Sequence, residues 1–202
     1  MGDNDTLTDA QLIERLLGRD RARADHALET IYRRHANAVF RYASMIAPSP
    51  EIASDAMQDA FIWFSGEGAS RFDPSRGSIA SLLCGVARNH VLRAQSSEAR
   101  FVYAEDDGEL EALAEADASL PDEFAMLDAQ QRERAMHQAL AELPHEFREA
   151  IVLVEFEEYS YEDAAAIVGC PIGTIRSRLN RAKARLRDRL TELFTPSERN
   201  AV

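Results

Sequence analysis

The sequence predicts an all-α protein built from two small helical domains that an acidic linker joins. No segment shows the apolar and polar alternation of a strand, whereas several segments repeat apolar residues every three or four positions, as helices do. Between these segments, residues 104–123 carry nine Asp or Glu and no Lys or Arg. We therefore divide the chain into an extension (1–24), a first domain (25–100), the linker (101–124), a second domain (125–195) and a tail (196–202).

Composition narrows the class of protein. The chain has 202 residues, 46% of them hydrophobic, and a formal net charge of -12. Its acidic N-terminus does not resemble a signal peptide, and no apolar run is long enough to cross a bilayer. We expect a cytoplasmic protein that does not insert into a membrane. Cys84 and Cys170 lack the paired spacing of a zinc site, so we expect free thiols and neither a metal nor another cofactor.

The first domain should open with a long core helix over residues 26–47. Its inward positions at helical spacing are Leu28, Ile31, Tyr32, His35, Val39, Tyr42, Ala43 and Ile46. The residues before it are expected to form either a flexible tail or a short helix around residues 11–17. After the break at Pro48 and Pro50, a second helix is expected over residues 51–64.

This second helix has two distinct faces. The inner face is apolar and consists of Ala53, Met57, Ala60, Phe61 and Phe64. The opposite face consists of Asp55, Gln58, Asp59 and Ile62. A short polar stripe with one aliphatic residue is by itself typical of ordinary protein surface.

Residues 71–93 should begin with a turn-forming loop and continue as a helix from about Ser78. Residues 71–100 carry five bases and only two acids, so the side of this domain that attracts anions is expected here. Helical spacing lets Arg88, Asn89 and Arg93 share one face.

In the second domain, residues 125–143 should form a helix that ends before Pro144, and residues 146–157 a second one. A helix-turn-helix follows. Ser160 with Asp163 three residues later is a helix start, Gly169 is a stop signal, and Pro171 cannot continue the same helix. The last helix then begins near residues 173–174.

This last helix is predicted to be basic on its outer side. Between residues 172 and 190 it carries one acid and seven bases, Arg176, Arg178, Arg181, Lys183, Arg185, Arg187 and Arg189. Its apolar stripe consists of Ile175, Leu179, Ala182, Leu186, Leu190 and Leu193. After a capped helix and a turn, such a helix fits the major groove of DNA. The alternative is an amphipathic helix whose charges are merely solvated.

Three motifs, taken together, resemble one known family. They are DAMQDAFIWF, FDPSRGSIASLLCGVARN and, in the second domain, LPHEFREAIVLVEFEEYSYEDAAAIVGCPIGTIRSRLNRAKARLR. The first two resemble region 2, and the third resembles region 4, of the sigma-70 superfamily, specifically the extracytoplasmic function (ECF) sigma factors. The resemblance covers about residues 25–195. It implies a protein that binds core RNA polymerase through the clamp helices and flap, and directs it to minus-35 and minus-10 promoter elements.

The resemblance also implies roles for individual residues. Those matching the polymerase-docking positions are Asp55, Gln58, Asp59 and Ile62. Those matching the minus-10 element, where a base is flipped and the strand melted, are Arg71, Asp73, Arg76, Ser78, Arg88, Asn89 and Arg93. Those matching the minus-35 surface are Thr174, Arg176, Ser177, Arg178, Asn180, Arg181, Lys183 and Arg185. Among the last group, Arg178, Lys183 and Arg185 are expected to position the DNA backbone or to stay solvated.

The chain departs from the family pattern at two places. Ile79 and Ser81 stand where the family commonly has an aromatic residue and Trp, so part of the aromatic packing near the melting site is missing. Asn180 stands where the family often has His or an aromatic residue, which affects the minus-35 sequence that is read.

The length of the linker suits a protein that contacts two separate promoter elements. Two promoter elements about two helical turns apart are separated by roughly 70 Å, and a 20-residue connector extends to roughly 66 to 72 Å. Because its acids would repel DNA, we expect the linker to lie in a positively charged channel of the polymerase.

Two other functional classes would fit part of the sequence. A free-standing helix-turn-helix repressor or activator would explain residues 125–195 but would leave the first domain unused. An enzyme acting on nucleic acid would need Asp55, Asp59 and His90 as metal ligands. We expect no enzymatic activity. ECF resemblance also implies an anti-sigma factor as a partner, one that is often membrane-bound and so holds the protein near the inner membrane.

Overall fold

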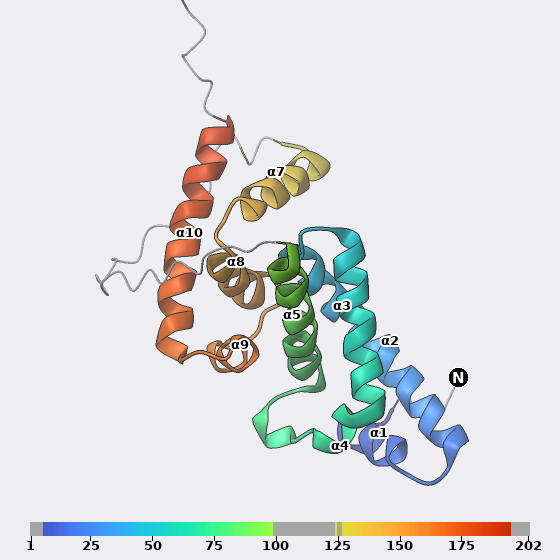
Figure 1. Ribbon diagram of the computed structural model, residues 1–202. Helices are drawn as coiled ribbons and strands as arrows, with labels where there is room; N and C mark the ends of the chain where they lie inside the picture. Colours follow the sequence, from blue (N-terminus) through green and yellow to red (C-terminus); the bar gives the residue numbers. More distant parts are fainter. Residues whose placement is uncertain (1–5, 99–123, 125–126, 195–202) are drawn as a thin grey trace, which may run out of the picture. The chain divides into compact units, whose positions relative to one another are not determined.

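The computed structural model describes residues 6–98, 124 and 127–194, all of them in helices or in the turns between helices. No strand occurs in this part of the chain, so the all-α prediction is confirmed. The helices form two compact units (Figure 1). The first contains α1 to α5. The second contains α7, α8 and α10, and α9 begins in it. The predicted linker lies outside the described residues, apart from Phe124.

The first unit is built around three long helices. Its elements are α1 (Asp9–Leu16), α2 (Arg21–Ile46), α3 (Pro50–Trp63), the π-helical turn η1 (Phe64–Gly68), α4 (Ala69–Arg71), the 3-10 turn η2 (Pro74–Arg76) and α5 (Ile79–Glu98). Helices α2, α3 and α5 pack pairwise on one another. The largest fully buried side chains of this core are Leu12, Ile31, Tyr42, Ile46, Phe64, Ile79 and Leu83.

Helix α2 begins five residues earlier than the apolar pattern predicted. Asp20 caps it by accepting a hydrogen bond from the backbone N–H of Arg23, so the start is set by a polar cap rather than by the first apolar residue. The expectation that Tyr32 lies inward is wrong. Its side chain is 45% exposed and packs edge-on against the Phe61 ring, with centroids 4.8 Å apart. Both rings therefore lie at the margin of the core.

Helix α3 starts as its sequence predicts and ends in an unexpected turn. Ser49 accepts a hydrogen bond from the backbone N–H of Ile52, and Pro50 occupies the first helical position. Beyond Trp63 the chain continues as the π-helical turn η1. A Cβ on Gly68 would lie 2.5 Å from the Trp63 ring, so only glycine lets this turn close against the tryptophan.

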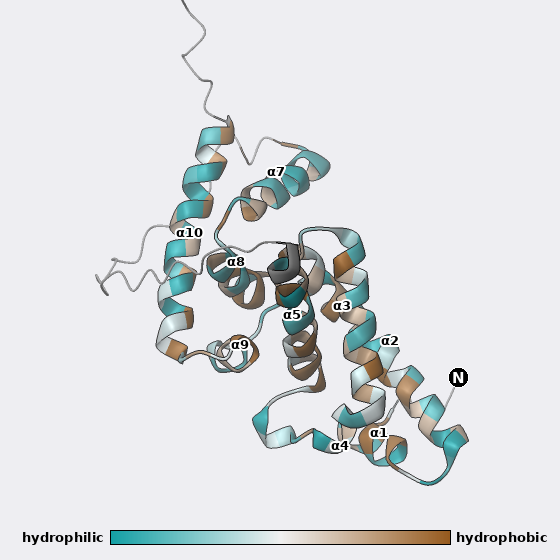
Figure 2. Ribbon diagram, in the orientation of Figure 1, coloured by the Kyte–Doolittle hydropathy of each residue, from teal (hydrophilic) through white to brown (hydrophobic). Residues whose placement is uncertain are grey.

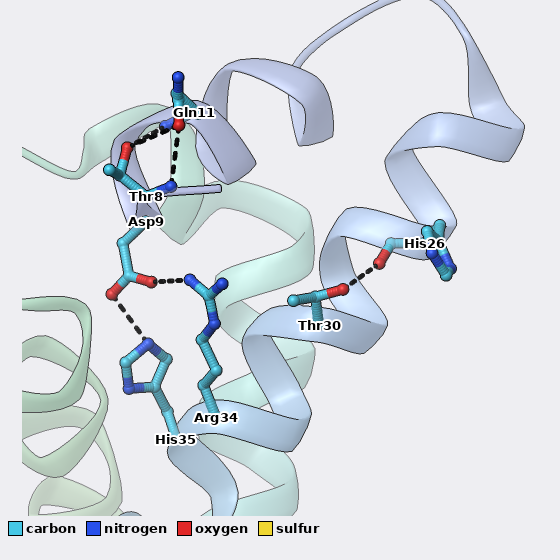
Figure 3. Close-up of polar contacts among 7 residues, drawn as sticks. All are labelled: Thr8, Asp9, Gln11, His26, Thr30, Arg34 and His35. Carbon is cyan, nitrogen blue, oxygen red and sulfur yellow. Dashed lines mark hydrogen bonds and ion pairs between the residues drawn. The ribbon is translucent and has the colours of Figure 1, made fainter. Parts of the chain in front are cut away.

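The N-terminal extension contains a helix that is held in place. Thr8 and Gln11 form a reciprocal capping box at the start of α1, and Leu12 and Ile13 are buried. Helix α1 packs against α2. Asp9 accepts hydrogen bonds from Arg34 Nη1 at 3.0 Å and from His35 Nε2 at 2.9 Å, both on α2 (Figure 3). The short-helix alternative for this extension is thus confirmed.

The second unit contains α7 (Ala129–Ala141), α8 (His145–Ile151), the π-helical turn η3 (Val152–Phe156), the first part of α9 (Tyr161–Val168) and α10 (Ile172–Phe194). Helix α7 starts at its Asp128 and Gln131 capping box, four residues later than predicted. Residues 146–157 do not form one regular helix. The last turn is π-helical, with the N–H of Glu157 donating to the carbonyl of Val152.

Arg148 fixes the corner between α7 and α8. Its Nη2 donates to the carbonyls of Ala141 at 2.6 Å and Leu143 at 3.0 Å, which satisfies the C-terminal end of α7. Burial lowers the pKa of the Arg148 guanidinium, and the neighbouring Glu149 carboxylate opposes that shift. Arg148 thus has a structural role in this unit and lies outside the predicted DNA-binding surfaces.

No described helix has both the length and the apolar character that a membrane span requires.

We predict that Asp9→Asn loosens α1 from α2, because the amide loses the charge that Arg34 and His35 share. A partly buried pair of this kind contributes about 1 kcal/mol, so the free energy of unfolding should fall by about that amount. Hydrogen exchange of the α1 amides should quicken. Glu14→Gln, an exposed charge change on the same helix, is the control and should leave exchange unaltered. Equal behaviour of both variants would contradict the assignment.

Candidate functional site

The turn between α9 and α10 is closed by backbone geometry. Ser160 Oγ accepts the N–H of Asp163 at 3.0 Å and donates to its carboxylate at 2.8 Å, which caps α9. Gly169 has φ +77, in the left-handed region, and the N–H of Cys170 donates back to the carbonyl of Ala165. The predicted start, stop and turn are therefore confirmed, and α10 begins at Ile172, a residue earlier than expected.

Helix α10 has one buried stripe. Its buried side chains are Ile175, Leu179, Ala182, Leu186 and Leu190. Leu193, the last predicted member, is only half-buried. The hydropathy colouring of α10 shows mostly teal turns interrupted by apolar positions, as this stripe requires (Figure 2). Burial of this stripe leaves the helix's bases on its other sides.

The N-terminal half of α10 carries a row of exposed and half-buried polar groups. Arg176 and Asn180 are exposed, and half-buried beside them are Thr174, Ser177, Arg178 and Arg181. The Arg176 guanidinium lies over the Tyr161 ring of α9, 5.4 Å from its centroid. Ser177 Oγ donates to the carbonyl of Thr174. The aromatic contact restrains the Arg176 side chain without using its in-plane donors.

The bases in the C-terminal half of α10 make contacts within the unit. Lys183 Nζ lies 2.8 Å from Glu155 of η3, and the Arg185 guanidinium lies over the Phe147 ring at 4.8 Å. Arg187 pairs with its neighbour Asp188 at 3.1 Å. Arg189 pairs with Glu142 and with Glu192. The predicted minus-35 residues thus fall into two groups: those near the start of α10, and the later Lys183 and Arg185, which contact η3 and α8, although Arg185 itself is exposed.

The outward face of α3 is confirmed as surface. Asp55, Gln58, Asp59 and Ile62 are all exposed, and Ile62 is exposed to 67%. Gln58 donates to Ser54 Oγ, and Asp59 lies 2.7 Å from His90 Nδ1. Beside Ile62 an open groove of about 390 Å³ runs between α2 and α3, lined by Asp25, Leu28, Glu29, Tyr32, Phe61, Ile62 and Ser65. The polar stripe therefore continues into an apolar recess with an acidic rim.

The loop before α5 is ordered by short-range contacts. Arg71 pairs with Glu67 at 2.8 Å. Hydrogen bonds from the Ser75 hydroxyl at 2.7 Å and from its backbone N–H at 2.9 Å hold the pKa of Asp73 below its usual value. Asp73 is therefore ionised at neutral pH, and its carboxylate closes the η2 turn. Arg76 is exposed.

Ser78 and Ser81 build the start of α5. Ser78 Oγ accepts the N–H of Ser81 at 3.0 Å, and Ser81 Oγ donates to the Ser78 carbonyl at 2.8 Å. Ser81 and Ile79, the two departures from the family pattern, are buried. One hydroxyl side chain, Ser81, and one aliphatic side chain, Ile79, thus occupy the two positions at which the family pattern predicts aromatic rings.

Further along α5, Asn89 and Arg93 are exposed and Arg88 is half-buried. Asn89 and Arg93 are four residues apart and so lie on one face, as predicted. His90, the next residue, points to Asp59 on α3. Within the described residues no group of three or more His, Cys, Asp and Glu side chains could hold a metal ion.

Sequence reasoning missed the partners of these side chains. Three bases of α10 contact residues far away in the sequence: Arg176 contacts Tyr161, Lys183 contacts Glu155, and Arg185 contacts Phe147. No helical spacing links residues so far apart, and only the packing of the helices brings them together. The pairing of His90 with Asp59 was missed for the same reason.

Comparison with known proteins agrees with this architecture. Residues 31–101 match the family Sigma-70 region 2, and residues 125–186 match Sigma-70, region 4. These matches cover the two helical regions in the order in which the structure places them. The chain belongs to the sigma-70 family of transcription initiation factors.

Individual relatives narrow the group. The chain is 32% identical over 182 residues to the RNA polymerase sigma-H factor of Pseudomonas aeruginosa, covering 87% of this chain and 90% of that protein. It is 31% identical over 183 residues to the ECF RNA polymerase sigma factor SigM of Mycobacterium tuberculosis, covering 89% and 83%. It is thus an RNA polymerase sigma factor of the ECF type.

One solved sigma factor structure has a similar fold. The sigma factor RpoE of Bartonella quintana, crystallised with the anti-sigma factor NepR, superposes with a TM-score of 0.61 at 29% identity, covering 81% of this chain and 96% of that one.

Two glycines at the helix-turn-helix provide a matched pair of variants. Gly169→Ala should lower the free energy of unfolding by about 1 kcal/mol, because alanine is strained at φ +77 although open space surrounds it. Gly173→Ala, inside α10 and also in open space, should raise stability by about 0.5 to 1 kcal/mol. Chemical denaturation measures both values. Shifts of the same sign would contradict the turn geometry.

Proposed function

We propose that the two units of this ECF sigma factor divide the work of initiation between three surfaces. The exposed face of α3 docks on core polymerase, through Asp55, Gln58, Asp59 and Ile62. The loop of residues 71–78 and the outer face of α5 bind the minus-10 element. The first half of α10 reads the minus-35 element. The observation that carries the assignment of α10 is that Arg176 and Asn180 near its start are exposed, whereas Lys183 and Arg189 further along are paired with Glu155 and Glu142.

The chemistry of each surface supports its role. The α3 surface combines carboxylates with an exposed aliphatic residue and an apolar groove, which suits a protein partner better than DNA. Arg71, Arg76 and Arg93 supply positive charge beside the loop, and Asn89 supplies an amide that can bind a base edge. Asp73 closes its own turn, so we assign it to shaping this loop.

Among the minus-35 residues we separate base contacts from backbone contacts. Thr174, Arg176, Ser177, Asn180 and Arg181 lie in the first three turns of α10, toward the end at which a recognition helix meets base edges. We assign Arg178, Lys183 and Arg185 to the DNA backbone, Lys183 because it is paired with Glu155, and Arg185 because it lies in the fourth turn of α10, beyond the turns that meet base edges. The acidic linker joins the unit with the proposed minus-10 surface to the unit with the proposed minus-35 surface. We propose that it lies in a positively charged channel of the polymerase.

Regulation and location follow from the same reasoning. The Bartonella relative was crystallised with an anti-sigma factor, and we propose an anti-sigma partner for this chain too. The protein has no catalytic activity of its own and works where core polymerase and promoter DNA are, in the cytoplasm at the nucleoid. The anti-sigma partner holds it near the inner membrane before release. A free-standing repressor would leave the α3 surface and the loop of the first unit without a use.

The minus-35 assignment is tested with two arginines of α10. Arg176→Ala should cost about 1 to 3 kcal/mol of holoenzyme binding to the cognate minus-35 element, and less on an element with substituted bases. Arg185→Ala is the control, because Arg185 lies in the fourth turn of α10, beyond the turns proposed to meet base edges; it should leave the ratio between the two elements unaltered. Binding is measured with core polymerase present. An equal loss on both elements would make Arg176 a phosphate contact.

The polymerase assignment is tested with two exposed aliphatic residues of the first unit. Ile62→Asp should weaken binding to core polymerase by about tenfold, because a charge replaces an apolar side chain at the proposed interface. Leu17→Asp makes the same change at a side chain exposed to 54% at the end of α1, outside the proposed surface. It should bind as the unmodified protein does. Titration of labelled protein with core polymerase measures both, and equal affinity of the two variants would exclude Ile62 from the interface.

A further inference from the structure

Asp59 is joined to the helix that carries the minus-10 residues. Its Oδ2 lies 2.7 Å from Nδ1 of His90, which projects from α5, while Asp59 itself belongs to the exposed face of α3. The two helices pack on one another in the core of the first unit. The side chain of Asp59 is 57% exposed and that of His90 is 31% exposed. The donor thus lies deeper than the carboxylate that it holds.

Folding stability does not account for this contact. An ion pair with one partner more than half exposed is screened by water and adds little to the stability of a protein. The imidazole can donate from Nδ1 whether it is neutral or protonated, so the hydrogen bond needs no charge on the ring. Its main physical effect is to restrict the rotamers of a carboxylate that faces solvent.

A restricted carboxylate binds a partner with less loss of entropy. Each long or polar side chain that becomes ordered in an interface costs free energy, and a side chain ordered beforehand avoids that cost. Neighbouring Asp55 lies one turn earlier on the same exposed face, and no ion pair joins it to His90 in the described part of the chain. The two acids therefore differ in how far α5 orders them.

We propose that His90 is a positioning residue for core polymerase binding, which holds the Asp59 carboxylate of α3 in the orientation that the polymerase accepts. The inference rests on the proposed role of the α3 surface. It assigns to His90 a function separate from DNA contact, although the residue lies beside Asn89 on the proposed minus-10 helix.

The test uses three substitutions of His90 in the full-length chain, with binding to core RNA polymerase as the measurement. His90→Ala removes the donor, and His90→Phe removes it while keeping an aromatic ring against the helices. Each should weaken binding by about three- to tenfold. His90→Asn places an amide N–H close to the position of Nδ1 and should restore affinity to within about twofold of the unmodified protein. Thermal unfolding of each variant confirms that it folds.

Double variants isolate the contact. In an Asp59→Ala background, His90→Phe should have no further effect on affinity, because the carboxylate that it positions is gone. In an Asp55→Ala background, His90→Phe should still cost about three- to tenfold. Asp55 thus serves as the matched control for the pair.

The outcomes separate this inference from the proposed function. If Asp59→Ala weakens polymerase binding but His90→Phe and His90→Asn behave alike, the positioning role is wrong and the α3 surface stands. If the effects of Asp59→Ala and His90→Phe simply add, the role is also wrong. If Asp59→Ala leaves polymerase binding unchanged, the docking role of Asp59 itself fails, and the positioning role fails with it.

Discussion

The second unit depends on a single constraint, that α10 must be core on one side and ligand surface on the other. A helix has 3.6 residues per turn, so positions three and four apart form the buried stripe and the rest are left for solvent or DNA. Ile175, Leu179 and Leu190 are almost fully buried on that stripe. Each core residue therefore fixes the rotation of α10, and with it the direction in which Arg176 and Asn180 point. Loss of this packing would therefore change the direction of Arg176 and Asn180 without a substitution at either residue.

Intramolecular contacts then decide which cations remain for a ligand. A base already paired with a carboxylate must give up that contact, or share it, before it can bind a phosphate. Lys183 with Glu155 and Arg189 with Glu142 are in this position, whereas Arg176 rests on an aromatic face that leaves its edge donors available. A sequence count of seven bases thus overstates the charge that α10 offers to DNA. Because these paired bases lie toward the C-terminal end, less of the charge there is available to a ligand than the sequence count implies.

The sequence predicted the parts of this architecture that depend on local chemistry. Apolar spacing located α2, α3 and α10, and the Ser160 cap with Gly169 located the turn before α10, because each of these signals acts within a few residues. Helix α2 started early because Asp20, a cap with no apolar neighbour, was outside the pattern. Tyr32 was misplaced because periodicity shows which side of a helix faces the core but not how wide the core is. The Asp9 contacts and the His90 contact join residues 25 to 31 positions apart, and no local rule could have found them.

Net charge bears on how such a protein can use its basic helix. With a formal charge of -12, the chain as a whole repels DNA at long range. Screening confines that repulsion to about 10 Å at 0.1 M salt, so a local group of bases can still make contact once the helix lies in the groove. The chain is therefore poorly suited to finding DNA by electrostatic steering. In the proposed function, core polymerase brings the subunit to DNA, which removes the need for steering and leaves the subunit to supply discrimination. On this view the acids suppress binding by the free subunit, and the minority of accessible bases on α10 suffices because it acts only after the polymerase has brought it close to DNA.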